Sequence, residues 1–193
     1  MRLPYWRKIL PFAMATGMNI LPVAPDHIPA LSALAVDTFR VTFGHLYPPE
    51  DLADFLETSY NPDTLLAETQ DPSQFWRMAW GEDGAPLGYL QCGPVSLPHA
   101  EADASRQGEL KRIYVAPQAQ GRGLGKRLLT TALDHLAERY GDTPQWIGVW
   151  SENHRAQALY AAHGFVPVGA YDFPVGRVRD HEFILRRIPR PRP

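Results

Sequence analysis

A glycine-rich stretch between a strand-like and a helix-like segment is the feature that most constrains the fold of this chain. The stretch runs from Gln120 to Gly125, follows the strand-like run 109–115 and leads directly into the helix-like run 126–140. A glycine turn at a helix start leaves backbone N–H groups unpaired at the positive end of the helix dipole. That arrangement binds phosphate or pyrophosphate without any particular side chain. The sequence therefore predicts a strand–loop–helix phosphate site, although an ordinary flexible turn would contain the same glycines.

Length and composition are those of one ordinary globular domain. The chain has 193 residues, of which 45% are hydrophobic and 21% charged. Its net charge of −2 gives no indication of a nucleic-acid or anionic-membrane partner, and no apolar stretch is long enough to span a bilayer. Cys92 is the only cysteine, which excludes an intramolecular disulfide and a multi-cysteine zinc site. We expect a cytoplasmic protein with no metal, no nucleic-acid partner and no membrane attachment.

The two ends of the chain differ from its centre. Residues 1–17 are interpreted as an N-terminal extension, residues 18–187 as the folded domain and residues 188–193 as a basic tail of proline and arginine. A signal peptide is the less favoured interpretation of the N-terminus, because Pro11 interrupts a short apolar segment.

Hydrophobic periodicity and turn residues predict the order of the elements. Strands are expected at 19–23, 75–80, 86–92, 109–115, 145–150, 165–168 and 181–187. Helices are expected between Asp26 and Gly44 and at 48–56, 126–140 and 153–163. Pro22 predicts that the first strand lies at a sheet edge. This order is typical of a single mixed α/β (α+β) domain.

Two spaced patterns resemble the GNAT superfamily of N-acetyltransferases. They are Gln120-x-x-Gly123-x-Gly125 and Asn153-x-x-Ala156-x-x-x-Tyr160-x-x-x-Gly164-Phe165. The resemblance implies a GNAT-like mixed, mostly antiparallel sheet, flanked by helices, with splayed central strands. It also implies transfer of an acetyl group from acetyl-CoA to an amine. Within the superfamily, the runs 109–115 and 146–150, together with Phe39-x-x-x-Phe43, Asp51-Leu52 and Phe55-Leu56, look like PaiA-type polyamine acetyltransferases.

The resemblance also implies roles for individual residues. The residues implied to bind acetyl-CoA are Ile113, Tyr114, Val115, Gln120, Gly121, Arg122, Gly123, Leu124, Gly125, Lys126 and Asn153. In such enzymes the loop holds the pyrophosphate through its backbone. The backbone of the strand 113–115 pairs with the pantetheine arm and stabilises the oxyanion of the tetrahedral intermediate. Arg122 and Lys126 add positive charge, although a solvated helix start would carry the same two residues. Tyr160 is implied to protonate the departing thiolate, because a phenol with a pKa of about 10 stays protonated at neutral pH. Asn153 can also cap its helix.

The base that deprotonates the amine is not assigned by either pattern. Ribosomal-protein N-terminal acetyltransferases of the superfamily place a glutamate in the strand before the asparagine helix, where this chain has Gly148. Glu152, Glu109 and Asp37 are candidates that would act through a water chain, although a surface or capping carboxylate is the favoured interpretation of each.

The acceptor is expected to be a small primary amine, with a polyamine such as spermidine as the first candidate. Eight acids against one base, Arg40, lie between residues 37 and 71 and would attract a cation, although a solvated helix face has the same composition. Trp76, Trp80 and Trp150 would line an alkylamine channel or fill the core. A protein or peptide acetyltransferase and a non-catalytic CoA-binding module are the alternatives, and a homodimer is left open.

Overall fold

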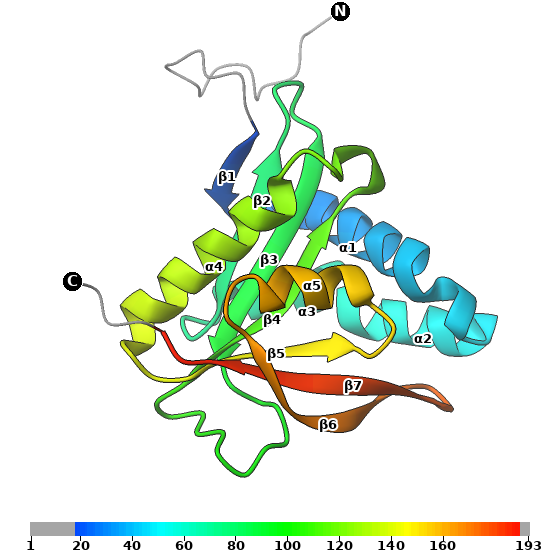
Figure 1. Cartoon of the computed structure of the whole chain (residues 1–193). Coiled ribbons are helices and arrows are strands. Elements are labelled where there is room, and N and C mark those ends of the chain that lie inside the picture. The colour runs from blue at the N-terminus through cyan, green and yellow to red at the C-terminus, as the bar shows by residue number, and fades with distance from the viewer. Residues whose placement is uncertain (1–17, 190–193) are drawn as a thin grey trace, which may run out of the picture.

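The computed structural model describes residues 18–189, in which helices cover both faces of one sheet (Figure 1). The strands are β1 (Asn19–Pro22), β2 (Phe75–Trp80), β3 (Pro86–Pro94), β4 (Gly108–Val115), β5 (Gln145–Trp150), β6 (Val166–Val175) and β7 (Val178–Arg187). The α-helices are α1 (Ile28–Phe43), α2 (Pro49–Tyr60), α3 (Pro62–Gln70), α4 (Leu124–Tyr140) and α5 (His154–Ala161). The predicted extension 1–17 and residues 190–193 of the predicted tail lie outside the described residues.

The sheet has the order β1-β2-β3-β4-β5-β7-β6, and its neighbouring strands are antiparallel except for β4 and β5. This confirms the predicted mixed, mostly antiparallel sheet. Helices α4 and α5 pack on one face, and α1, α2 and α3 pack on the other (Figure 1). Strand β1 lies at the edge, as Pro22 predicted, because proline has no N–H to donate to a further strand.

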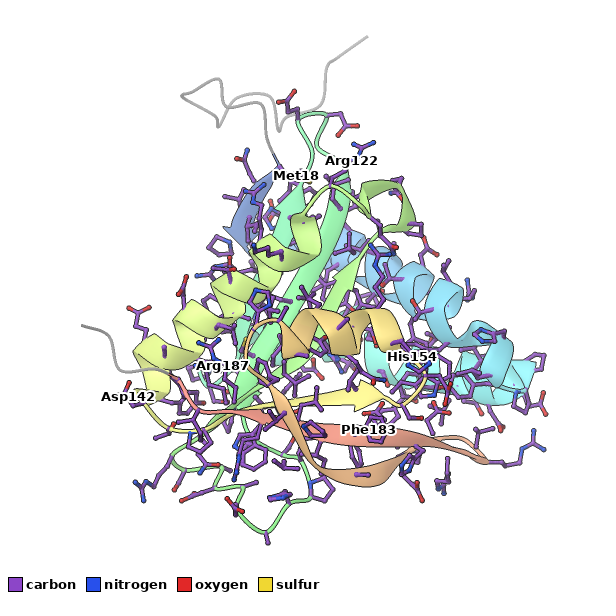
Figure 2. All side chains as sticks on the ribbon, viewed as in Figure 1. Met18, Arg122, Asp142, His154, Phe183 and Arg187 are labelled. Carbon is purple, nitrogen blue, oxygen red and sulfur yellow. The ribbon has the colours of Figure 1, made fainter. Side chains whose placement is uncertain are left out.

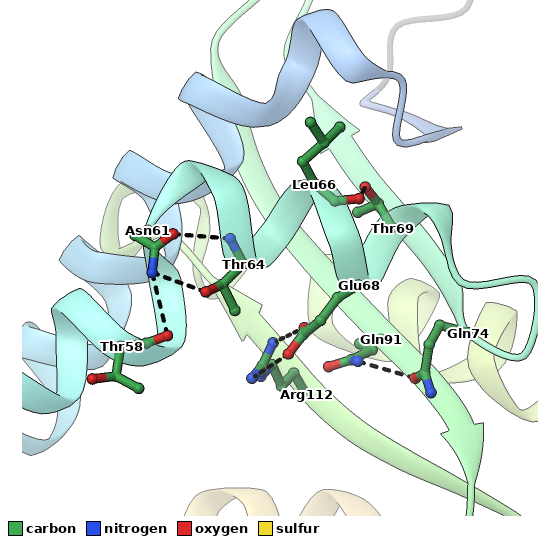
Figure 3. Close-up of polar contacts among 9 residues, drawn as sticks. All are labelled: Thr58, Asn61, Thr64, Leu66, Glu68, Thr69, Gln74, Gln91 and Arg112. Carbon is green, nitrogen blue, oxygen red and sulfur yellow. Dashed lines mark hydrogen bonds and ion pairs between the residues drawn. The ribbon is translucent and has the colours of Figure 1, made fainter.

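The structure contains a helix, α3, that the sequence analysis missed. Asn61 caps it, since its Oδ1 accepts a hydrogen bond from Thr64 N at 2.9 Å, and Pro62 occupies the first helical position (Figure 3). The helix has nine residues and buries only Leu65 completely, so its hydrophobic periodicity is weak. Capping was therefore the stronger local signal for this element.

The last two strands are longer than predicted. They were expected at 165–168 and 181–187, but β6 and β7 run to a tight turn at Gly176, whose φ is +54°. Pro174 lies within β6, and proline there argued against a strand. Because β6 is the outermost strand of the sheet, the side of Pro174 that lacks an N–H needs no partner.

Strands β4 and β5 separate after a short pairing. They are paired only at Gly108–Gln145, Glu109–Trp146 and Leu110–Ile147. On the other side of β4, Cys92 faces Leu110 and Gln91 faces Arg112, so Lys111 is an extra residue that forms a bulge. Beyond the bulge β4 stays with β3, and β5 stays with β7. The expected splayed central strands are therefore present.

The core on the α4 side holds the two separating strands in place. Leu128, Leu129 and Leu136 of α4 are completely buried against Leu110 and Ile147, the last pair before the strands part. The apolar face of α4 thus supports the point at which the sheet opens.

No helix within residues 18–189 combines the length and the apolar character that crossing a bilayer requires. The same residues include no cluster of three or more His, Cys, Asp or Glu side chains placed to hold a metal ion.

We predict that Leu136→Ala lowers the free energy of unfolding by about 2–5 kcal/mol, because it leaves a cavity beneath the sheet. Leu21→Ala on β1 is the control, since Leu21 is 42% exposed and its truncation should cost under about 0.5 kcal/mol. Urea unfolding followed by circular dichroism measures both. Equal losses for the two variants would contradict this assignment of the core.

Candidate active site

A cavity of about 1180 Å³ follows the opening between β4 and β5. At one end it is lined by the glycine loop and the start of α5. At the other end it is lined by α1, α2, β5 and the β6–β7 hairpin. The opening in the sheet therefore connects the predicted phosphate site to a second region formed by different elements.

The glycine loop has the geometry of an anion site. Gly121 and Gly123 have φ values of +77° and +78°, which only glycine adopts without strain, and an added Cβ at either would meet nothing within 4 Å. The hydrogen bond from Arg127 N to Gly123 O is the first that helix α4 makes at this end. The N–H groups of Leu124 and Gly125 precede it and have no carbonyl one turn back, so they are available to a ligand.

Helix α5 contacts this loop through Arg155, and Asn153 caps the start of the helix. Asn153 Oδ1 accepts a hydrogen bond from Ala156 N at 3.1 Å, which confirms that Asn153 caps the helix. Arg155 Nη1 donates to Gln120 Oε1 at 2.7 Å, and Gln120 Nε2 donates to Val115 O. Arg155 lines the cavity and was missed in the sequence, although its place two residues after Asn153 was a usable signal.

Most of the predicted site residues lie together. Those that line the cavity are Ile113, Tyr114, Val115, Gln120, Gly121, Gly123, Leu124, Gly125, Lys126, Asn153 and Tyr160. Arg122 is exposed at the outer end of the loop and lies outside this lining (Figure 2). Its contact with a pyrophosphate stays a prediction, as do the ligand contacts of the other residues.

The edge of β4 that faces β5 is open beyond the bulge. Ile113, Tyr114 and Val115 pair with β3 on one side only. Their side chains pack into the core, and the Tyr114 ring stacks on Tyr89 with centroids 5.4 Å apart. An extended ligand in the opening can therefore pair with this backbone as another strand would.

Tyr160 is buried on the α5 side of the opening. Its ring packs edge-on against Phe165, with centroids 6.1 Å apart. Burial raises the pKa of the phenol, and the negative charge of Glu182 raises it further. Tyr160 therefore holds its proton throughout the neutral range.

The three carboxylates considered as bases have unfavourable positions. Glu109 lines the cavity, but its Oε2 accepts hydrogen bonds from Ser96 N at 2.7 Å and Ser96 Oγ at 3.0 Å, and Lys111 Nζ lies 3.3 Å away. Glu152 and Asp37 are exposed and outside the cavity lining. None of the three is free and placed at the opening.

Two carboxylates of β7, which the sequence analysis missed, lie in the cavity instead. Asp180 Oδ2 accepts a hydrogen bond from the Tyr47 hydroxyl, and Glu182 Oε2 accepts one from the Tyr171 hydroxyl at 2.6 Å. Burial raises the pKa of Glu182, and the charges of Asp180 and Glu109 raise it further. Across residues 18–189, neither Asp180 nor Glu182 forms an ion pair with a cationic side chain. Two acids at alternate positions of one predicted strand region were the available signal.

The acidic wall expected from residues 37–71 is not on the cavity. Only Glu68 and Asp71 of those eight acids line it, and Arg112 Nη1 pairs with Glu68 Oε2 at 2.6 Å (Figure 3). Of the three tryptophans, Trp150 lines the cavity, whereas Trp76 is buried in the core. Among the described residues, the cavity carboxylates without a cationic partner are Asp71, which accepts a hydrogen bond from Ser73 N, and Asp180 and Glu182 of β7.

Comparison with known proteins decides the family. A family model described as the acetyltransferase (GNAT) family matches residues 29–165. The chain belongs to this family. It is 33% identical over 172 residues to an uncharacterised N-acetyltransferase of Lactobacillus delbrueckii subsp. lactis, covering 89% of this chain and 98% of that protein. The protein is accordingly an N-acetyltransferase, which confirms the predicted enzyme class.

Two other similarities concern the fold and a shorter segment. The PaiA N-acetyltransferase of Thermoplasma acidophilum, in complex with coenzyme A, superposes with a TM-score of 0.70 at 19% identity, covering 90% of this chain and 99% of that chain. A spermine/spermidine N(1)-acetyltransferase of Bacillus subtilis is 36% identical over 64 residues, which is 33% of this chain and 42% of that protein. Membership of the acetyltransferase (GNAT) family supports acetyl-CoA as the acetyl donor. The free N–H groups of the loop and the open edge of β4 fit such a donor.

We predict that Gly123→Ala weakens the binding of coenzyme A about tenfold or more, a loss of about 1.4 kcal/mol, because the loop binds through its backbone. Gly141→Ala is the matched control, since Gly141 lies at the other end of α4 with a φ of +67° and the same open surroundings. Isothermal titration with coenzyme A should find the control within about twofold of wild type. Equal weakening in both variants would assign the effect to general strain in α4.

Proposed function

We propose that this N-acetyltransferase acetylates a primary amine of a small cationic molecule, with a polyamine such as spermidine as the leading candidate. The observation that carries the proposal is the pair of cavity carboxylates, Asp180 and Glu182, which tyrosine hydroxyls contact and no described cation neutralises. A partly buried carboxylate is unfavourable without a compensating charge. The ammonium group of a substrate supplies that charge.

Aromatic side chains surround the two acids and favour an alkylammonium over a hydrated metal ion or a neutral ligand. Phe43 packs edge-on against Trp150 with centroids 5.7 Å apart, and Phe55 packs against Phe173 at 6.0 Å. All four line the cavity, and each pair joins a helix to a strand. Aromatic faces attract cations, and their apolar area covers the methylene groups between two amines.

The choice of a polyamine among cationic amines rests on similarity. Runs 109–115 and 146–150 look like PaiA-type enzymes, and one of the structures that share the fold is a PaiA N-acetyltransferase. The segment similar to the spermine/spermidine acetyltransferase of Bacillus subtilis points in the same direction. These similarities favour a polyamine without excluding other alkylamines.

The cavity residues divide the work of the reaction. Bound acetyl-CoA supplies the thioester, and the loop 120–126 with the β4 backbone at 113–115 holds it along the opening. A β4 N–H stabilises the negative charge that develops on the carbonyl oxygen. Tyr160, which lines the cavity on the α5 side, gives its proton to the departing sulfur.

An amine panel tests the function directly. Release of coenzyme A thiol is followed with acetyl-CoA and spermidine, spermine, a diamine, a monoamine, and peptides with a free N-terminus or a lysine. We expect polyamines to give the highest kcat/KM, and Asp180→Asn to raise KM for spermidine about tenfold, because the variant removes one attractive charge. A preference for either peptide would refute the polyamine proposal in favour of a protein acetyltransferase. Binding of coenzyme A without turnover of any amine would favour a non-catalytic module.

We predict that Tyr160→Phe lowers kcat by about 10²- to 10⁴-fold, because the sulfur then leaves without a proton donor. The affinity for coenzyme A should stay unchanged, since the ring and its packing on Phe165 are kept. Tyr140→Phe on α4, whose ring lies outside the cavity lining, is the matched control and should keep wild-type kcat. Unchanged kcat in Tyr160→Phe would remove this residue from the mechanism.

A further inference from the structure

A missing side chain in β5 makes room for a carboxylate from β7. Gly148 is the first residue of β5 beyond Leu110–Ile147, the last pair before the opening. A Cβ added at Gly148 would lie 3.1 Å from Glu182 Oε2 and 2.9 Å from the Tyr171 hydroxyl. The carboxylate of Glu182 therefore occupies the space that a side chain at position 148 would need, at the point where the sheet opens.

We infer that Glu182 is the general base that takes a proton from the acceptor ammonium, and that Tyr171 is the positioning residue that holds its carboxylate. The inference rests on the proposed amine acetyltransferase function and deepens it. Strand β7 then supplies the basic carboxylate, because β5 contains no acidic residue in this chain.

The other carboxylates of the cavity are less suited to this role. Glu109 is held by Ser96 and Lys111, and Glu68 is paired with Arg112. Asp71 accepts a hydrogen bond from Ser73 N. Asp180 lies two residues nearer the hairpin turn and faces Tyr47 rather than Gly148. Glu182 is the described cavity carboxylate that adjoins the opening without a cationic partner.

Acid and base then approach the opening from opposite faces of the sheet. Tyr160 belongs to the core cluster beneath α4 and α5. Glu182 lies two residues before Ile184 in β7 and therefore on the same face, where Ile184 packs with Leu97 and Trp146. The charge of Glu182 contributes to the raised pKa of Tyr160, so the two groups are close enough to interact.

The proton balance closes with these two residues. Glu182 takes one proton from R–NH₃⁺, and the nitrogen lone pair of the resulting R–NH₂ forms the C–N bond to the acetyl carbon as the C–S bond breaks. Tyr160 gives a proton to the sulfur, and the second proton lost by the nitrogen restores the phenol through solvent. Glu182 releases its proton to solvent, so each turnover yields an amide, a thiol and one net proton.

The surroundings of Glu182 make its carboxylate more basic than an exposed one. Burial raises the pKa of the carboxyl, Asp180 and Glu109 raise it further, and the Tyr171 hydrogen bond opposes them. The titratable groups that face it are Tyr47, Glu109, Tyr114, Tyr160, Tyr171 and Asp180. A base acts only when deprotonated, so activity should fall as the pH drops through this raised pKa.

The first test compares pH profiles of kcat/KM for spermidine. Glu182→Gln should lower kcat/KM at pH 7 by about 10²- to 10⁴-fold and remove the inflection of Glu182 from the profile, so that the acidic limb moves to the pKa of the amine. The variant should regain about tenfold per pH unit toward the amine pKa of about 10.4, because solvent then supplies the free amine. Asp172→Asn is the control, since Asp172 is an exposed carboxylate of β6 that pairs with His181 outside the cavity.

Two neighbouring variants should move the acidic limb in opposite directions. Tyr171→Phe removes the hydrogen bond that lowers the pKa of Glu182, so the limb should shift to higher pH. Asp180→Asn removes a negative charge that raises this pKa, so the limb should shift to lower pH. A purely structural role for Tyr171 or Asp180 would change the rate without these shifts.

Moving the carboxylate between strands tests the geometry itself. Glu182→Gly should be inactive, and Gly148→Glu alone should also be impaired because its side chain meets Glu182 and Tyr171. The double variant Gly148→Glu/Glu182→Gly supplies a carboxylate from β5 beside the space that Glu182 vacates, and the Tyr171 hydroxyl is the close contact that must still shift. We expect it to exceed Glu182→Gly by about tenfold or more in kcat/KM.

The outcomes separate this inference from the proposed function. If the wild-type enzyme acetylates amines and Glu182→Gln keeps the same acidic limb, the role of Glu182 is overturned and the proposed function stands. If Glu182→Gln does not fold, judged by its thermal melt, the opposite shifts of Tyr171→Phe and Asp180→Asn decide, and their absence overturns the inference. No wild-type turnover with any amine overturns both.

Discussion

The separation of β4 from β5 after three paired positions is the constraint on which the rest of the structure depends. The bulge at Lys111 redirects β4 immediately beyond its last pair, Leu110–Ile147. The outer edges of the two strands remain paired with β3 and β7, so the sheet is continuous while its centre is open. Backbone groups along the opening need partners, and an extended ligand can provide them. The cavity follows this opening, and it is where the proposed acetyl donor and acceptor would meet.

The position of the β6–β7 hairpin determines which charged side chains line the end of the cavity proposed for the acceptor. Its turn at Gly176 rests against Asp51 of α2, whose Oδ2 accepts hydrogen bonds from Arg177 N and Arg177 Nε, both at 3.0 Å. This contact ties the hairpin tip to a helix from the first third of the chain. Asp180 and Glu182 follow the tip along β7 and are held at the cavity as a result.

The acids of the cavity fall into two groups with different consequences. Arg112 and Lys111 neutralise Glu68 and Glu109, which stabilises the walls and removes these charges from use. Tyrosine hydroxyls hold Asp180 and Glu182 without neutralising them. A hydrogen bond from a neutral donor orients a carboxylate, but leaves its charge available to a ligand. This difference is why the cationic-acceptor proposal depends on β7 and not on the acid-rich segment 37–71.

The sequence by itself determined the parts that depend on neighbours along the chain. The glycine loop before α4, the capping of α5 by Asn153 and the edge position of β1 follow from backbone geometry, local hydrogen bonds and the missing N–H of Pro22. Tertiary structure alone decided that Arg155 contacts Gln120 and that Glu182 fills the space beside Gly148. The second contact depends on the pairing of β7 with β5 and on the absence of a side chain on the opposite strand. Local periodicity carries no information about which strands become neighbours, so these two contacts could be assigned only once the sheet had formed.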